Sequence, residues 1–195
     1  MDADKLAKAF ELFDSYNSKD PNSYHWNGKD YPQELFFALQ VYGWVIKLDT
    51  QASEALLLAS RCQHIGRWES PRSSYPDGKA GYLNWRSNLA KFHSEKAASL
   101  LREAGYDEEL IDQVKRINLK QGLKTDHEVQ TMENALCLVF LQFEYESFIT
   151  KHDDEKLIRV LRKSWAKMTE PGRSIALTIN YSERASDLLQ RALAS

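Results

Sequence analysis

The sequence predicts an all-α fold, a single-domain helical bundle formed by residues 1–195. Apolar residues recur every three or four positions through most of the chain, and no stretch alternates between apolar and polar residues as a strand would. Glycine and proline are scarce, with 8 and 5 among 195 residues. A chain of this length can bury a core without disulfides or a structural metal. We therefore expect one domain with two loops, at about residues 17–31 and 67–81.

Capping residues and helix breakers set the expected helix boundaries. Pro32 suits the first turn of the second helix, Thr50 can cap the third, and Gly105 can end the fourth. Asp153 and Ser182 can cap the last two helices through their side chains. In chain order, the expected helices cover residues 4–16, 32–48, 52–65, 82–105, 107–119, 126–143, 154–168 and 182–193, with a break at Pro171-Gly172.

Composition and charge exclude several functional classes. The 26 basic and 28 acidic residues nearly cancel, so no overall field attracts nucleic acid or an anionic membrane. The N-terminus lacks the layout of a signal peptide, and the longest apolar run, Ala135–Leu141, is too short to span a bilayer. We expect a cytoplasmic protein without a membrane partner. Cys62 and Cys137 lie in apolar stretches and are expected to be core residues.

The common catalytic signatures are missing from the sequence. It contains no glycine-rich phosphate loop, no Cys-x-x-Cys pair, no Gly-x-Ser-x-Gly elbow and no His-Glu-x-x-His. Kinase, dehydrogenase, serine hydrolase and zinc-finger functions therefore have no support from motifs.

Polar residues occupy positions where the helical pattern requires apolar ones. His93 shares a stripe with Leu89, Ala97 and Leu100, and Glu133 similarly follows Val129 by four positions. A carboxylate on a core stripe is costly unless it is neutralised, paired or metal-bound. His64 ends one helix and Glu34 begins another, each next to apolar residues.

If these four side chains converge, neutral imidazoles and carboxylates suit a divalent manganese, iron or zinc ion. His64, His93 and Glu133 are the expected metal ligands. Glu34 is expected to be a fourth ligand or a general base, and His64 is expected to be a catalytic residue as well as a ligand. Simpler explanations remain for each residue. A histidine on a core face is often only hydrogen-bonded, Glu34 suits the first turn of a helix, and a buried salt bridge to an arginine would explain Glu133.

Residues 57–67, LLASRCQHIGR, resemble the signature helix of the HD superfamily of all-helical, metal-dependent phosphohydrolases. The stretch from Phe92 to Leu101 is similar to a later helix of that superfamily that often carries a histidine. Residues 130–136 stand where those proteins place their last acidic ligand. The sequence departs from the pattern at Gln63-His64, which replaces His-Asp, and at Glu133-Asn134, which replaces the terminal Asp. No histidine lies in the second helix.

Four strings also resemble an uncharacterised domain-of-unknown-function family, some members of which carry a tRNA-synthetase label. These strings are QHIGRW at 63–68, PRSSYP at 71–76, GYLNWR at 81–86 and KHDDEK at 151–156. That resemblance implies no particular reaction, and the sequence has no nucleotide-binding signature of a synthetase.

The segment from 67 to 91 combines basic and aromatic residues and directly follows His64. Guanidinium groups can bind phosphate in a bidentate manner, and aromatic faces can stack on a base or sugar. The alternative is an ordered loop whose aromatic residues pack on the bundle. A second basic stripe, at 156, 159, 163 and 167, is interpreted as a solvated helix face. The expected substrate-binding residues are Arg67, Arg72, Tyr75, Lys79, Trp85 and Arg86.

These features lead to two functional hypotheses. The first is an HD-like, metal-dependent phosphohydrolase acting on a nucleotide or another phosphorylated small molecule. The second is a degenerate, non-catalytic HD-like domain that binds a nucleotide, RNA or a protein partner through the basic, aromatic loop.

Overall fold

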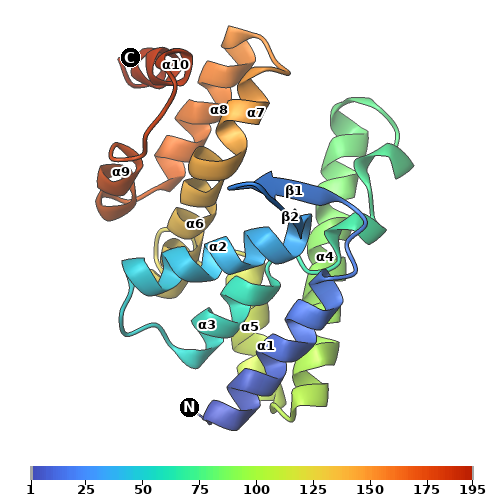
Figure 1. Cartoon of the computed structure of the whole chain (residues 1–195). Helices are drawn as coiled ribbons and strands as arrows, with labels where there is room; N and C mark the ends of the chain where they lie inside the picture. The colour runs from blue at the N-terminus through green and yellow to red at the C-terminus, as the bar shows by residue number, and fades with distance from the viewer. Residues whose placement is uncertain (1, 195) are drawn as a thin grey trace.

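The computed structural model describes residues 2–194, and it confirms the all-α prediction (Figure 1). Helices account for nearly all regular structure in the described chain, and the two strands form one small hairpin. In chain order the elements are α1 (Ala3–Asn17), β1 (Ser23–Trp26), β2 (Lys29–Pro32), α2 (Gln33–Leu48), α3 (Glu54–Cys62), η1 (Arg67–Glu69), η2 (Arg72–Ser74), α4 (Gly78–Ala104), α5 (Glu108–Asn118), α6 (His127–Val139), η3 (Phe140–Glu144), α7 (Tyr145–Ile149), α8 (Asp154–Lys167), α9 (Glu170–Ala176) and α10 (Glu183–Leu193).

Side-chain caps define most of the helix starts. Asp153 and Ser182 cap α8 and α10, as the sequence predicts, by accepting hydrogen bonds from backbone amides of the first turn. Asp107 and Asp126 cap α5 and α6 in the same way. The expected cap at Thr50 is wrong. Ser53 is the N-cap, because its side chain accepts the hydrogen bond from the Leu56 amide, and α3 begins at the next residue, Glu54.

The expected loop at 17–31 contains an antiparallel hairpin, so the prediction of no strands is wrong there. Ser23 pairs with Pro32, and Trp26 with Lys29, around a two-residue turn. Asn27 and Gly28 both have positive φ values, 49° and 77°, which favours Asn-Gly at a tight hairpin turn. Tyr24 on β1 stacks on Phe36 of α2 with ring centroids 4.5 Å apart, so aromatic packing anchors the hairpin.

Three further boundaries differ from the prediction. The loop at 67–81 contains two short 3-10 turns, η1 and η2, and α4 begins at Gly78 rather than near residue 82. The long helix expected over 126–143 is interrupted by the π-helical η3 and continues as α7. The helix expected over 154–168 does end at Lys167, but Pro171-Gly172 is not a break. Pro171 lies in the first turn of the short helix α9, where its missing amide hydrogen costs nothing.

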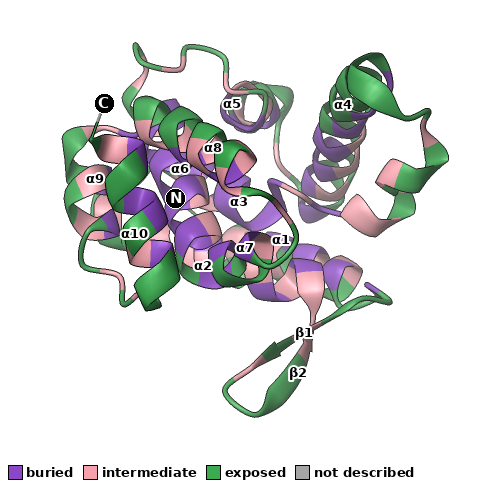
Figure 2. Ribbon diagram, turned by 90° about the horizontal axis from the view of Figure 1, so that it is seen from above, coloured by how far each residue is buried: buried purple, intermediate pink, exposed green. Residues whose placement is uncertain are grey.

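The core consists of two hydrophobic clusters that share α6. The first joins α1 to α6 and includes Phe13, Leu58 and Met132. The second joins α6 to α10 and includes Leu138 and Leu188. Buried residues concentrate where α2, α3, α5 and α6 meet, whereas the tip of the hairpin lies at the surface (Figure 2). Polar residues buried in this central region therefore require hydrogen-bond or ion-pair partners.

No helix among residues 2–194 combines the length and the apolar character that crossing a bilayer requires.

Candidate functional site

Two adjoining hollows form one cleft between α2, α4, α6 and the segment after α3. Their volumes are about 180 Å³ and 320 Å³. We call the smaller one, beside His93, the histidine hollow, and the larger one, beside Glu133, the glutamate hollow. Both are lined by His64, Arg67, Arg86 and Lys120. Five of the expected site residues line the glutamate hollow: Glu34, His64, Arg67, Arg86 and Glu133. Four line the histidine hollow: His64, Arg67, Arg86 and His93.

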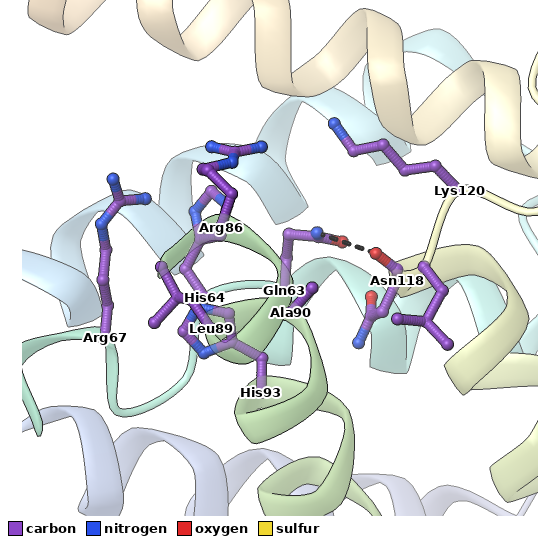
Figure 3. A pocket seen from close by; sticks show the side chains of 10 residues that line it. Gln63, His64, Arg67, Arg86, Leu89, Ala90, His93, Asn118 and Lys120 are labelled. Carbon is purple, nitrogen blue, oxygen red and sulfur yellow. Dashed lines mark hydrogen bonds between the residues drawn. The ribbon is translucent and has the colours of Figure 1, made fainter. Parts of the chain in front are cut away.

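A sharp turn places His64 and Arg67 on the cleft wall. Gly66 lies between them in the left-handed region, with a φ of 68°. A Cβ atom there would lie 3.0 Å from ring atoms of both Phe92 and Tyr16, so glycine is also required for space. The turn ends α3 and directs the Arg67 side chain into the cleft (Figure 3).

His93 is buried and presents a free acceptor to the histidine hollow. Its Nδ1 lies 2.7 Å from the Ile65 carbonyl oxygen, which can only accept, so Nδ1 carries the proton. Its Nε2 is buried and has no hydrogen-bond partner. Burial lowers the pKa of His93 to about 4, with Arg67 and Arg86 contributing to the decrease. The imidazole is therefore neutral at pH 7.

His64 lies beside His93, with ring centroids 5.7 Å apart. Burial holds its pKa well below the ordinary histidine value, and the positive charge of Arg67 lowers it further. The structure thus brings two neutral imidazoles together in one cleft, which is the form of histidine that binds metals.

Glu133 lies on the opposite wall, where its carboxylate forms ion pairs with two lysines. Lys120 contacts Oε2, and Lys167 Nζ lies 3.1 Å from Oε1. Burial alone would raise the pKa of Glu133, but the two ammonium groups more than offset it and hold the pKa below its ordinary value. The sequence-based alternative of a buried salt bridge describes this contact, although the partners are lysines rather than an arginine.

The predicted metal ligands do not form one ligand set. Within residues 2–194, no group of three His, Cys, Asp or Glu side chains is arranged to hold a metal ion. His64 and His93 are suitable metal ligands, because imidazole nitrogens bind transition metals and both side chains are neutral. The Glu133 carboxylate, in contrast, already forms ion pairs with two lysines. Metal binding by His64, His93 and Glu133 together stays a prediction.

Glu34 has the properties of an acid–base group. It is 4% exposed, and its Oε1 is 3.9 Å from Arg67 Nε. Burial raises the pKa of Glu34 from 4.5 to about 7, because the Arg67 charge only partly compensates for desolvation. The carboxyl group can therefore gain or lose a proton near neutral pH.

Replacing Glu34 with glutamine should change how stability depends on pH. Between pH 4.5 and 7 the folded wild type binds more protons at Glu34 than the unfolded chain, so its stability falls as pH rises. Glutamine cannot titrate, so Glu34→Gln should gain stability relative to wild type over this range, by up to about 3 kcal/mol. Urea unfolding at pH 5 and pH 8 measures the change. The exposed Glu155→Gln serves as the control, and a constant difference at both pH values would contradict the raised pKa.

Three cations extend to the same side of the cleft, beyond the histidines (Figure 3). Arg67 follows the turn after α3, Arg86 lies on α4, and Lys120 follows α5 with a φ of 57°. Arg67 is 3.9 Å from Glu34, and Lys120 contacts Glu133. Arg86 forms no ion pair with any residue in the described chain. The cleft therefore has positive charge available for an anionic ligand.

The comparisons give this domain a family. Residues 7–189 match the sequence pattern of a protein family described as a domain of unknown function, DUF4202. The chain belongs to this family. The match includes every residue that lines the cleft, so the cleft lies inside the DUF4202 domain. No curated protein and no solved structure matches the chain. The comparisons support neither the HD resemblance nor the tRNA-synthetase label.

Four of the expected substrate-binding residues of this DUF4202 domain lie apart from the two hollows. The Arg72 guanidinium donates to the carbonyl oxygens of Tyr75 and Pro76, at 2.8 and 2.9 Å, and so stabilises its own loop. Trp85 is buried and donates its indole N–H to the Ser70 carbonyl oxygen. Lys79 is exposed at the start of α4. None of these residues, nor Tyr75, is among those lining either hollow, and their role in substrate binding stays a prediction.

The DUF4202 cleft also contains residues that the sequence interpretation missed. Gln63 and Asn118 line the histidine hollow, and both lie on apolar stripes, with Ala59 and Val114 four positions before them. The pattern that singled out His93 would have found them. Lys120 lies outside the regular helices and gives no periodic signal. Lys167, assigned to a solvated face, instead contacts Glu133.

Proposed function

We propose that the cleft binds a phosphorylated small molecule and hydrolyses its phosphate ester. The observation that carries this proposal is the convergence of Arg67, Arg86 and Lys120 on the wall shared by the two hollows. Guanidinium and ammonium groups form charge-assisted hydrogen bonds with phosphate oxygens, and they are strongest where water is partly excluded. A cytoplasmic location remains part of the proposal.

The charges near these cations leave them available to a ligand. Lys120 and Lys167 together offset the negative charge of Glu133. Glu34 is only partly ionised at pH 7 because of its raised pKa, and the pKa of Glu144, the third carboxyl group lining the glutamate hollow, is also raised. Arg86 has no carboxylate partner among residues 2–194. A phosphate dianion in the shared region would therefore meet more positive than negative charge.

Glu34 is the proposed general base. In its carboxylate form it would accept a proton from water as the water oxygen forms a bond to phosphorus. The ester P–O bond breaks, and the alcohol leaves with a proton taken from solvent. A pKa of about 7 suits this role, because the carboxylate is then present and still basic at neutral pH. His64, neutral and adjacent to Arg67, would hold the water or a phosphoryl oxygen by a hydrogen bond.

A manganese, iron or zinc ion would act as a Lewis acid toward phosphoryl oxygens if it were bound. His64 and His93 are the residues suited to hold it, and Glu133 is not, because of its lysine partners. The ion pairs of Glu133 with Lys120 and Lys167 leave the predicted set of three metal ligands incomplete. This favours the second candidate function, a domain that binds the phosphorylated molecule without turnover.

Phosphate release and ligand binding, measured on the same protein, test the proposal. Ribose 5-phosphate, AMP and p-nitrophenyl phosphate would be supplied with manganese, iron or zinc, and in parallel with chelator. We expect kcat/KM to rise with pH through about 7, and Glu34→Gln to lose turnover while still binding ligand in calorimetric titrations. Binding without phosphate release under every condition would favour the non-catalytic function. An absence of binding to all three compounds would refute the proposal.

A further inference from the structure

Three unpaired hydrogen-bond acceptors are buried in the wall of the histidine hollow. They are His93 Nε2, Gln63 Oε1 and Asn118 Oδ1, and none has a hydrogen-bond partner. The three residues are 4%, 8% and 7% exposed. Buried polar atoms are normally paired, and leaving one unpaired costs about 1–3 kcal/mol. Three such atoms around one hollow are acceptors available to the donor groups of a ligand.

The neighbouring contacts identify each atom as an acceptor. His93 Nδ1 donates a hydrogen bond to the Ile65 carbonyl oxygen, which leaves Nε2 as the acceptor nitrogen of the ring. The Gln63 amide nitrogen donates to the Asn118 carbonyl oxygen at 3.2 Å, which leaves Oε1 as the free end of that amide (Figure 3). Asn118 Nδ2 donates to Cys62 Sγ, which leaves Oδ1 free.

The lining of this hollow favours hydroxyl groups over a nucleobase. None of its ten lining residues is Phe, Tyr or Trp, so a nucleobase would have only imidazole and guanidinium planes to stack on. Three acceptors suit several hydroxyl donors held at different angles. The adjoining Arg67, Arg86 and Lys120 would hold a phosphate at the entrance while the hydroxyls point inward.

We propose that the histidine hollow binds the hydroxyl-rich part of a sugar or polyol phosphate, an inference that rests on the proposed phosphate-binding function. Gln63, His93 and Asn118 accept hydrogen bonds from the hydroxyl groups. The ligand class is thus a phosphate ester with two or more free hydroxyls, rather than a bare phosphate or a nucleobase.

Titrations with ribose 5-phosphate and methyl phosphate test this inference, because both are phosphomonoesters and only one carries ring hydroxyls. We expect ribose 5-phosphate to bind at least about tenfold more tightly, as two net hydrogen bonds would provide. Gln63→Met removes the Oε1 acceptor, and Asn118→Leu removes the Oδ1 acceptor. Each variant should lower the preference several-fold while the affinity for methyl phosphate stays unchanged. Gln113→Met, at an exposed position of α5, should have no effect.

The outcomes separate the two proposals. Equal affinity for both esters in the wild type would overturn the hydroxyl-binding inference and leave phosphate binding intact. A preference that survives in both variants would also overturn it, because the hydroxyls would then bind elsewhere. An absence of binding to either ester would instead refute the proposed function. The affinity for methyl phosphate reports in each variant that the cleft is folded.

Discussion

Arg86→Ala should weaken the binding of ribose 5-phosphate by roughly ten- to a hundredfold, the loss expected for one hydrogen bond to a charged group. Arg86 lines both hollows and has no ion pair within the described chain, so its guanidinium is available to the phosphate. The residue is exposed on α4, and its removal leaves no buried charge unpaired. The melting temperature should therefore stay close to that of the wild type.

Isothermal titration calorimetry with ribose 5-phosphate at two salt concentrations measures this loss of affinity. Arg159→Ala is the matched control, because Arg159 is an exposed arginine on α8 that does not line either hollow. Arg86→Lys should recover part of the affinity, since lysine keeps the charge but loses the bidentate geometry. If Arg86→Ala binds as tightly as the wild type, the anion does not lie where the three cations converge.

The double substitution of Lys120→Met and Lys167→Met should destabilise the fold by about 3 kcal/mol at pH 7.5, the effect of leaving a buried carboxylate without a partner. Glu133 is 2% exposed, and these two lysines are its ion-pair partners. In the wild type the lowered pKa of Glu133 stabilises the fold above pH 4.5, and this contribution is lost as the pH falls through the folded-state value. In the variant burial raises the pKa instead, and protonation relieves the penalty. The difference between the two proteins should shrink between pH 7.5 and pH 4.

Urea unfolding at several pH values checks this expectation. Adding Glu133→Gln to the double variant should restore most of the lost stability, because the buried charge is then removed. A control with Lys151→Met and Lys163→Met, two exposed positions, should unfold like the wild type. A loss of stability that does not depend on pH, or that Glu133→Gln fails to recover, would mean that the lysines act through packing rather than charge.

The helices were predictable because their signals are local. Asp153 and Ser182 cap helices through side chains that lie within three residues of the amides they bind. The hairpin escaped prediction although Asn27-Gly28 carries a turn signal, because its strands are only four residues long and pack on Phe36 in the first turn of α2, a tertiary contact that the sequence pattern does not show. Thr50 failed as a cap because Ser53 occupies that position instead.

The candidate site was predictable where a polar residue interrupts an apolar helical stripe. His93 and Glu133 were found in this way, and Gln63 and Asn118 obey the same rule. The partners of Glu133 could not be predicted, since Lys120 lies 13 positions away in an irregular turn and Lys167 lies on another helix. The sequence places Arg72 in a loop and Arg86 on a helix, but it assigns both the same role in substrate binding. Only the fold reveals that Arg72 bonds to its own loop while Arg86 lines the cleft.

The position of α6 between the two hydrophobic clusters has a consequence for how the chain unfolds. One side of this helix contributes Val129, Met132 and Ala135 to the first cluster, and another contributes Cys137 and Leu138 to the second. If α6 loses its helical structure, both clusters lose packed side chains at the same time. Neither cluster can then persist as a separate folding unit, and the domain should unfold in a single cooperative transition despite having two cores.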